Sequence, residues 1–530
     1  MIAPLPHDSE TSREPSGQRA RRTALLPLGL ILLLQSVASL SLHNTAYLDE
    51  ALYLWAGRQI VHHWQGGPPT DDFAQLFSGT PYLYPVLGGL LDSVGGLEAA
   101  RLFSLACMLG ATVAVYALTQ TLYDRRSAVF AAALFAGQGS VLFLGHFATY
   151  DALCLALLAG ATLLALKAGA ARTPAGAFAV GAALLLAVAA KYAGLLYVPM
   201  VLLIFGWQTA RSHGWAQALL RSGIALAVMA CGALLLVLVA GHSIWDGLNS
   251  TTLNRTAFHP ASPWWVARRA LSLGGGFTLL AALGWWLDGR RRGHPIWVAL
   301  LATAFLAPAY HIADAEAMSL HKHIAYGLFF AAPLAGYAAD RLCSLHLSSR
   351  RWAFRSVAPS RRPDWLAGAA VCALLFVIGI SQAYQEFHGW RNTDASVRAL
   401  RASLRPGDHI LAEMAEVPRY YLQDEAGPDQ WSNFPWFQYG PSALHGTQAF
   451  QAATDEGYFD LVILHYEKGA ALAHRIDPIL NDGKHYTLIV KQPGFWIWRR
   501  KKAAIQEPRP SSNRVSPPLG GTWTGKAASE

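Results

Sequence analysis

Apolar runs of about twenty residues, separated by short polar connections, follow one another through the first 384 residues of the chain. A helix of roughly 20 apolar residues spans the hydrocarbon core of a bilayer. We therefore predict a polytopic α-helical membrane domain with about eleven spans. The predicted spans are residues 23–42, 98–123, 128–145, 152–170, 174–190, 192–207, 222–240, 270–287, 295–310, 324–339 and 365–384.

One further apolar run, residues 83–94, is short for a span and carries Asp92, so we expect a surface helix that lies flat on the outer face. The arginine clusters between spans then all fall on the side of the basic N-terminus, as the positive-inside rule requires. The N-terminus is cytoplasmic and the C-terminus external in this interpretation. A cleaved signal peptide is the alternative interpretation of run 23–42, because both have a basic start and an apolar core. The clusters are Arg125 with Arg126, Arg172, and residues 211–221, 290–292 and 350–362.

Composition leads to the same class of protein. Hydrophobic residues make up 53% of the 530 positions and charged residues 14%, which is more apolar surface than a soluble protein of this length buries. The net charge of +9 could indicate a nucleic-acid partner, but the arginines lie between apolar runs, so we assign them to topology and expect no nucleic acid. The five cysteines lie in or beside apolar runs, so no disulfide framework is expected in the polar C-terminal region.

Polar composition returns after residue 384, and residues 385–502 predict a small external α/β domain. Its aromatic segment, residues 431–440, either offers ring faces to a sugar or is buried in the domain, and we favour burial. Residues 1–22 and 503–530 have compositions typical of disorder, the first on the cytoplasmic side. Within the domain, residues 407–414, 458–466 and 485–500 have the pattern of strands, and residues 417–422 and 468–480 that of short helices.

The candidate reacting centre is the acidic pair Asp49 and Glu50, which follows the first apolar run. Carboxylates at a membrane boundary are costly to desolvate, which favours water or a polar substrate as their surroundings. The alternative is an ordinary solvated pair in a loop. Asp151 is a second candidate because it lies where one span ends and the next begins, although capping of a helix N-terminus would also explain it.

Cations accompany these carboxylates on the same predicted side. Lys191 separates two apolar runs on the outer side, against the positive-inside trend, and is expected to meet an anion such as a lipid phosphate. Snorkelling to lipid headgroups is the alternative. Lys322, His323 and Tyr326 repeat this pattern of donors at the entrance of a span, where an interfacial belt would also explain the aromatic member.

Several motifs occur in an order that resembles the GT-C superfamily of polyprenyl-phosphate-sugar glycosyltransferases. The similarity is greatest to the bacterial protein O-mannosyltransferase and aminoarabinose-transferase-like enzymes (glycosyltransferase family 39-like), and it covers roughly residues 25–339. In place of the Lys-Pro-Pro of many relatives, this chain has Gly79-Thr80-Pro81, and His321-Lys322 stands where arginine is more usual. The motifs are YLDEALYLW at 47–55, GTPYLYP at 79–85, EAARLFS at 98–104, LYDRRSAVFAAALFA at 122–136, HFATYDAL at 146–153, KYAGLLYVP at 191–199 and HKHIAYGLFFAAPLAG at 321–336.

The resemblance implies a GT-C-like helical bundle and an inverting transfer of sugar from a polyprenyl-phosphate donor to a hydroxyl or phosphate of a protein, lipid or cell-envelope glycan. Asp49 would be the general base, Glu50 would orient the acceptor or assist, and Asp151 would position the base or the sugar. The active site would lie on the non-cytoplasmic side of the plasma (inner) membrane. The donor phosphate would be bound by Lys191, Lys322, His323 and Tyr326, and substrate by Tyr53, Tyr82, Tyr84, His146 and Tyr192.

Physical chemistry supports a lipid-linked donor, because nucleotide sugars are absent outside the cytoplasm and the sequence has no phosphate-binding glycine loop. The sequence identifies no certain cofactor. A divalent metal is a possible addition, with His62 and His259 among its candidate ligands, but no His-x-x-x-His pair supports it and interfacial histidines are the simpler interpretation. The alternative function is a polytopic transporter or flippase of lipid-linked sugars, which should carry ionisable residues near mid-membrane.

Overall fold

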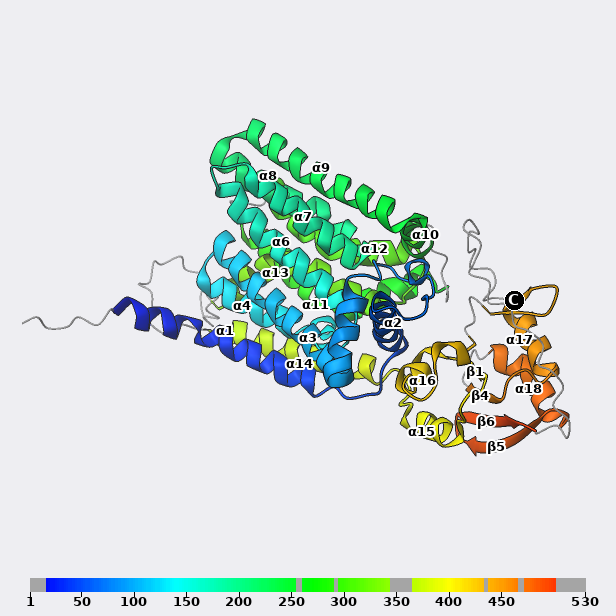
Figure 1. Cartoon of the computed structure of the whole chain (residues 1–530). Helices are drawn as coiled ribbons and strands as arrows, with labels where there is room; N and C mark the ends of the chain where they lie inside the picture. Colours follow the sequence, from blue (N-terminus) through cyan, green and yellow to red (C-terminus); the bar gives the residue numbers. More distant parts are fainter. Residues whose placement is uncertain are drawn as a thin grey trace, which may run out of the picture.

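The computed structural model describes residues 16–253, 260–289, 294–343, 365–432, 437–465 and 471–501. Long helices form a bundle, and a smaller domain of helices and strands lies beyond one end of it (Figure 1). The predicted polytopic helical domain with a small C-terminal α/β domain is therefore confirmed.

The bundle contains the helices that correspond to the predicted spans. Seven of the described helical segments are long and apolar enough to cross a membrane, and Leu25–Leu40 and Ala175–Ala190 are shorter apolar helices. The bundle helices are α1 (Ser16–Leu40), α3 (Tyr84–Leu122), α4 (Arg125–Ala136), α5 (Gly139–Leu144), α6 (Tyr150–Ala170), α7 (Ala175–Ala190), α8 (Val198–His213), α9 (Trp215–Ala240), α11 (Pro263–Leu287), α12 (Pro295–Ala313), α13 (Leu320–Leu342) and α14 (Leu366–Phe387).

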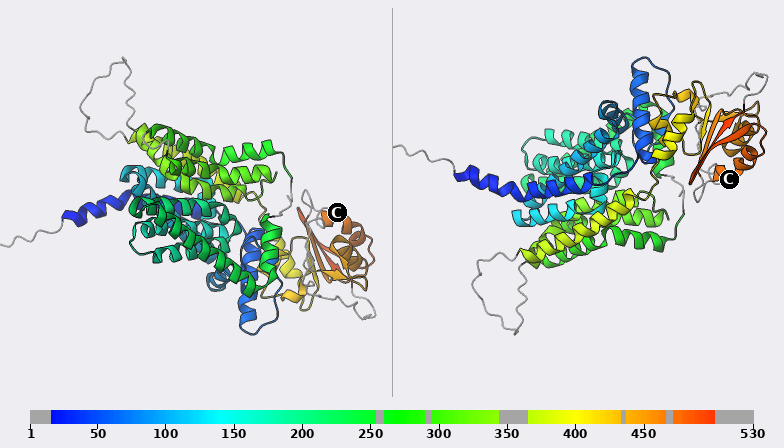
Figure 2. Two further views of the ribbon diagram at one scale, coloured as in Figure 1. Left: turned by 90° about the horizontal axis from the view of Figure 1, so that it is seen from above. Right: turned by 90° about the horizontal axis from the view of Figure 1, so that it is seen from below.

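Two differences from the predicted spans have local causes. The predicted span 128–145 is divided into α4 and α5, because the helix breaks at Gly137 and Gln138 and restarts at Gly139. A helix does form over residues 84–94, but it continues into the span that was predicted from residue 98, so that both belong to α3 with a kink at Gly95 and Gly96. Gly96 has φ 66°, a conformation that side chains with a Cβ rarely adopt. The segment before the kink crosses the end of the bundle (Figure 2).

The centre of the bundle is α13, which is buried along almost its whole length and packs against α4, α11 and α12. Glycines allow these helices to approach closely. A Cβ at Gly327 would lie 2.3 Å from the carbonyl oxygen of Thr303, and one at Gly336 would lie 2.4 Å from that of Ser127. Although it is central, α13 is not among the seven helices selected by length and hydropathy, because charged and polar residues occupy both of its ends.

Short elements cover the end of the bundle that faces the C-terminal domain (Figures 1 and 2). The most important is α2 (Leu48–Trp64), which packs along the first part of α3. The others are η1 (Phe73–Gln75), η2 (Tyr192–Tyr197), α10 (His242–Leu248) and η3 (Asn249–Leu253).

The C-terminal domain is built on a four-stranded sheet in the order β1-β4-β6-β5, with β1 and β4 parallel and the other pairs antiparallel. β2 and β3 form a separate antiparallel pair. The strands β1 and β4 and the helices α16 and α18 overlap predicted segments. The single strand predicted over residues 485–500 is instead two antiparallel strands, β5 and β6, separated by a turn at Pro493 and Gly494. The elements are α15 (Asp394–Ser403), β1 (Ile410–Ala412), α16 (Glu416–Tyr421), η4 (Pro428–Gln430), β2 (Gln438–Tyr439), β3 (Leu444–His445), α17 (Gly446–Asp455), β4 (Leu461–His465), α18 (Ala471–Asn481), β5 (Tyr486–Gln492) and β6 (Phe495–Arg500).

The aromatic segment of this domain is buried where the structure describes it. Trp431, Phe437 and Tyr439 belong to the two cores of the domain, and residues 433–436 lie outside the described residues. This agrees with burial, the interpretation that the sequence favoured, over an open sugar-binding face.

Candidate active site

Asp49 lies in the first turn of α2, where its carboxylate accepts a hydrogen bond from Lys322 of α13, with 2.8 Å between Oδ2 and Nζ. Tyr47 ends the preceding extended segment, and the backbone turns into the helix at Leu48. A quarter of the Asp49 side chain is exposed, whereas Lys322 is buried. Asp49 is therefore a carboxylate that a substrate can reach, held against a buried cation.

Asp151 occupies the corresponding position in α6, one residue after the helix begins at Tyr150. Its carboxylate forms an ion pair with Lys191, which caps the C-terminus of α7, and both side chains are buried. Thr149 donates a further hydrogen bond to Asp151 at 3.1 Å, and Tyr326 donates to the Asp151 carbonyl oxygen at 3.0 Å. Capping of the α6 N-terminus alone would not require a buried ion pair and these additional hydrogen bonds.

Lys322 joins the two carboxylates, since its Nζ lies 2.8 Å from Asp49 and 4.0 Å from Asp151. We call Asp49, Asp151, Lys191 and Lys322 the charge cluster. Its members come from separate helices and helix ends and meet at one end of the bundle, as the sequence predicts. Two carboxylates and two ammonium groups balance, so the cluster has no net charge when all four are ionised.

Aromatic rings enclose the charge cluster. The hydroxyl of Tyr53 donates to that of Tyr150 at 2.6 Å, and the two rings stack. The Lys191 ammonium lies 4.9 Å from the centre of the Tyr150 ring, and that of Lys322 lies 5.5 Å from the centre of the Phe147 ring. Burial raises the pKa of Tyr53, and Asp49 adds to the rise, so the phenol stays protonated and can donate. The rings shield the buried members of the cluster from solvent, which strengthens the electrostatic interactions between the charges.

Glu50 is next to Asp49 in sequence but faces a different environment. It is completely buried and accepts hydrogen bonds from the Arg101 guanidinium at 2.8 and 2.9 Å. The backbone N–H groups of Tyr47 and Ala148 also donate to it, at 2.9 and 2.8 Å. Its oxygens are thus occupied by the protein, and they join the start of α2 to the segment before α6.

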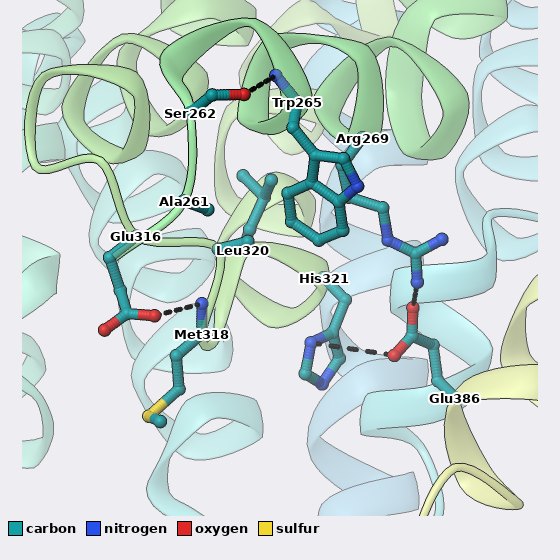
Figure 3. A pocket seen from close by; sticks show the side chains of 10 residues that line it. Ala261, Ser262, Trp265, Arg269, Glu316, Met318, Leu320, His321 and Glu386 are labelled. Carbon is teal, nitrogen blue, oxygen red and sulfur yellow. Dashed lines mark hydrogen bonds and ion pairs between the residues drawn. The ribbon is translucent and has the colours of Figure 1, made fainter. Parts of the chain in front are cut away.

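A cavity of about 720 Å³ lies beside the first turn of α13 (Figure 3). Arg269 of α11 forms an ion pair with Glu386 of α14 in its wall, and His321 lies 3.9 Å from Glu386. Trp265 and Met318 contribute apolar surface. The next residue of α13 after His321 is the lysine that joins the charge cluster, so the cavity and the cluster share this helix turn.

Comparisons with known proteins identify this architecture. A family model described as dolichyl-phosphate-mannose-protein mannosyltransferase matches residues 87–245. Among solved structures, ArnT from Cupriavidus metallidurans in the apo state is 13% identical with a TM-score of 0.60, covering 90% of this chain and 98% of that one. The structure of the same protein bound to undecaprenyl phosphate is also 13% identical in sequence, with a TM-score of 0.61, and the match covers 94% of this chain and 100% of that one. The chain has the GT-C fold.

The GT-C fold also accounts for a third similarity, to the apo oligosaccharyltransferase of Archaeoglobus fulgidus, at 13% identity and a TM-score of 0.50, covering 90% of this chain and 75% of that one. The comparison with curated proteins gave no match. The predicted resemblance to the GT-C superfamily is confirmed by these findings.

Within the GT-C fold of this chain, the segment GTP at 79–81 supports Lys191. The Thr80 N–H donates to the carbonyl oxygen of Ala189, and the Tyr192 N–H donates to that of Ser78, both at 2.8 Å. A Cβ at Gly79 would lie 2.3 Å from the carbonyl oxygen of Ala190. A glycine here therefore lets the loop pair with the break between α7 and η2 that presents Lys191.

Replacing Gly79 by alanine is expected to destabilise the protein by roughly 1–3 kcal/mol, because the contacted atom is backbone and cannot rotate away. The thermal unfolding midpoint in detergent measures the effect. Gly110→Ala is the matched control, since a Cβ at Gly110 would meet no heavy atom within 4 Å. An equal response of the two variants would contradict the close contact.

The structure places other predicted site residues around the charge cluster. His323 lies 4.0 Å from Asp151, and the buried Tyr192 follows Lys191 directly. The buried Tyr84 ring meets the Tyr150 ring edge-on, with 6.5 Å between centroids. These side chains can shape the site.

Two predicted substrate-binding residues lie elsewhere. Tyr82 is 45% exposed and stacks on Trp64 at the far end of α2. His146 contacts Glu98 at 3.0 Å and the Leu42 carbonyl oxygen, on the Glu50 side of α2, where burial and Arg101 lower its pKa.

The two candidate metal ligands gain no support as a pair. His62 is exposed, more than three helical turns after Asp49 in α2. His259 lies outside the described residues. Among the residues that the structure describes, no three His, Cys, Asp or Glu side chains are arranged to hold a metal ion.

Sequence reasoning missed three contributors to the site. Arg101 lies within a predicted span, and a charge inside an apolar run was the signal that could have identified it. Tyr150 lies in the motif HFATYDAL, but nothing in the sequence distinguishes it from the other aromatic residues near the site. The pair of Arg269 and Glu386 joins helices that are far apart in sequence, and no local pattern indicates it.

Proposed function

We propose that this protein is an inverting glycosyltransferase that moves a sugar from a polyprenyl-phosphate donor to an acceptor hydroxyl or phosphate of a protein, lipid or cell-envelope glycan. The observation that carries the proposal is the charge cluster at one end of a GT-C bundle, beside a cavity with an apolar wall and a cation. The relative with the same fold whose structure contains undecaprenyl phosphate supports a lipid-linked donor.

Asp49 is the general base in this proposal, because it is the cluster carboxylate with an exposed fraction. The acceptor oxygen attacks the anomeric carbon and forms the new glycosidic bond. Its proton passes to Asp49, while the bond from the anomeric carbon to the phosphate oxygen breaks and its electron pair stays on the phosphate. A single displacement of this kind inverts the configuration at the anomeric carbon.

The charge balance of the cluster couples proton uptake by Asp49 to the departure of the phosphate. When Asp49 takes up the proton it loses its negative charge, and the cluster changes from neutral to a net charge of +1. Lys322, which is buried and 2.8 Å from Asp49, then has an uncompensated charge just as negative charge develops on the departing phosphate. In a site that contains little water, this electrostatic stabilisation of the departing phosphate is large. Lys191 is buried and influences the phosphate only indirectly, through its ion pair with Asp151.

The cavity beside α13 suits the phosphate end of the donor. Arg269 and His321 supply donors in its wall, and Trp265 supplies apolar surface for a prenyl chain (Figure 3). On the same helix, Tyr326 donates to the carbonyl oxygen of Asp151, and His323 lies 4.0 Å from the Asp151 carboxylate. Glu50 is a positioning residue, since its buried oxygens fix the turn that presents Asp49.

The active end of the bundle faces away from the cytoplasm in this proposal. Successive helices alternate in direction, so the starts of α4 and α9 and the ends of α6 and α8 lie at the end opposite to α2 (Figure 1). Arg125 and Arg211 lie in those termini, and Arg172 lies in the connection just after α6. The positive-inside rule assigns that end to the cytoplasm.

A transfer assay tests the proposed function. Purified protein in nanodiscs is incubated with undecaprenyl phosphates that carry radiolabelled hexoses or pentoses, together with membrane extract as a source of acceptors. Transfer of label from one donor, with release of undecaprenyl phosphate, is the expected result. Mass spectrometry of lipids that copurify with the protein narrows the choice of donor. In proteoliposomes, movement of the intact lipid-linked sugar across the bilayer without cleavage would favour the transporter.

A further inference from the structure

The C-terminal domain contacts the helix that carries Asp49. Its short helix α16 packs on α2, and Val417 and Tyr420 belong to the same buried core as the α2 side chains (Figure 1). The guanidinium of Arg419 lies 3.6 Å from the centre of the Trp55 ring, and both side chains are buried. This is a packed interface between the two domains.

A group of three interacting polar residues, Arg58, Asp92 and Tyr420, lies at the centre of this interface, and we call it the polar joint. The Tyr420 hydroxyl donates to Asp92 Oδ1, and the Arg58 guanidinium forms an ion pair with Asp92 Oδ2 at 2.6 Å. Arg58 also donates to the Asp92 carbonyl oxygen at 3.1 Å. Tyr420 belongs to the C-terminal domain, Arg58 to α2 and Asp92 to the surface part of α3. One buried carboxylate therefore connects three elements.

The backbones at this joint approach closely, which leaves little room for α2 to slide. A Cβ at Gly57 would lie 1.8 Å from the carbonyl oxygen of Pro85, and one at Gly89 would lie 2.7 Å from the Arg58 nitrogen. The position of α2 is thus set by α3 on one side and by α16 on another.

A second set of contacts holds the residues just before α2. The Ala46 N–H donates to the Tyr421 hydroxyl at 2.7 Å. The Trp390 indole donates to the Thr45 carbonyl oxygen at 3.0 Å, and the Thr393 N–H donates to the Thr45 hydroxyl at 3.1 Å. The segment that enters the Asp49 turn is therefore held by residues that follow the last bundle helix.

Helix geometry relates these contacts to Asp49. Arg58 follows Asp49 by nine positions, which is about two and a half turns of an α-helix, so the two side chains leave α2 on opposite sides. The joint supports the back of the helix while the front faces Lys322. A rotation or tilt of α2 would move the Asp49 carboxylate away from its 2.8 Å contact.

We propose that α16 is a positioning element for the transfer reaction, and that Tyr420 is a positioning residue which acts on Asp49 through Asp92 and Arg58. The inference rests on the proposed function for its kinetic consequence. It assigns the C-terminal domain a role in ordering the catalytic helix, in addition to any contact with an acceptor.

Tyr420→Phe tests the proposal, because it removes one hydroxyl and leaves Asp92 paired with Arg58. Tyr439→Phe is the matched control. Its hydroxyl also donates to a carboxylate, Glu456 at 2.8 Å, in the same domain but in a core that contains no α2 side chain. Both full-length variants are measured in nanodiscs by hydrogen–deuterium exchange of the peptides that cover α2, and by kcat and KM.

Tyr420→Phe is expected to raise exchange over residues 48–58 and to lower kcat on the order of tenfold with little change in KM, as for loss of one buried hydrogen bond to a charged group. Tyr439→Phe is expected to change neither. Unchanged exchange over α2 in Tyr420→Phe would overturn the positioning role, whatever reaction the protein catalyses. Raised exchange with unchanged kcat would overturn the link to Asp49, and raised exchange in a protein without transferase activity would reject the proposed function alone.

Discussion

Asp49→Asn is expected to lower kcat for the proposed sugar transfer by about 10²- to 10⁴-fold, the contribution typical of a general base. Asparagine has the same shape and can still accept the hydrogen bond from Lys322, so the fold should be retained, but the buried Lys322 ammonium loses its nearest counter-charge and the unfolding midpoint should fall. The amide cannot take up the acceptor proton, and the cluster cannot couple that proton to the phosphate charge. Single-turnover transfer from a labelled lipid donor measures the effect.

Asp246→Asn is the control for this variant. Asp246 is an exposed acidic residue in α10, at the same end of the bundle, and it is not part of the charge cluster. Its replacement should leave kcat unchanged. If Asp49→Asn retained full activity, Asp49 would not be the base, and Asp151 would be the next carboxylate to examine.

Arg101→Met lowers the free energy of unfolding by roughly 3–5 kcal/mol, because it leaves the buried Glu50 carboxylate without its cation. The remaining donors to Glu50 are the N–H groups of Tyr47 and Ala148, which cannot replace a full charge. Unfolding by SDS in mixed micelles provides the measurement.

The matched control is Arg401→Met. Arg401 pairs with Glu425 at 2.7 Å, but both side chains are largely exposed, so its loss should cost only about 0–1 kcal/mol. A similarly small loss for Arg101→Met would show that Glu50 reaches water, and the positioning role given to Glu50 would fail with it.

The sequence predicted the bundle well because a membrane requires long apolar helices whatever their order in space. It also predicted that Asp49, Asp151, Lys191 and Lys322 meet, because polar residues at helix ends on one side of a membrane share a narrow layer. It could not predict which lysine pairs with which carboxylate, since this depends on how the helices pack. Both lysines were assigned to the donor phosphate, and the structure shows each already paired with an aspartate.

Contacts between distant segments were beyond sequence reasoning. Glu50 and Asp49 are adjacent and chemically alike, yet only packing against Arg101 separates a buried structural carboxylate from an accessible one. The hydrogen bond between Tyr420 and Asp92 joins residues 328 positions apart. Asp92 stands out in the sequence as a charge in an apolar run, but no periodicity or motif indicates Tyr420 as its partner.

The central position of α13 bears on how the chain enters the membrane during synthesis. This helix is too polar at its ends to be selected by hydropathy, yet it is almost fully enclosed by α4, α11 and α12. Its transfer from the translocon into lipid is therefore only weakly favourable, and contacts with the helices that are synthesised earlier stabilise it in the membrane. Integration of the segment that carries Lys322 thus depends on helices already in the bilayer, and the charge cluster is completed late in biogenesis.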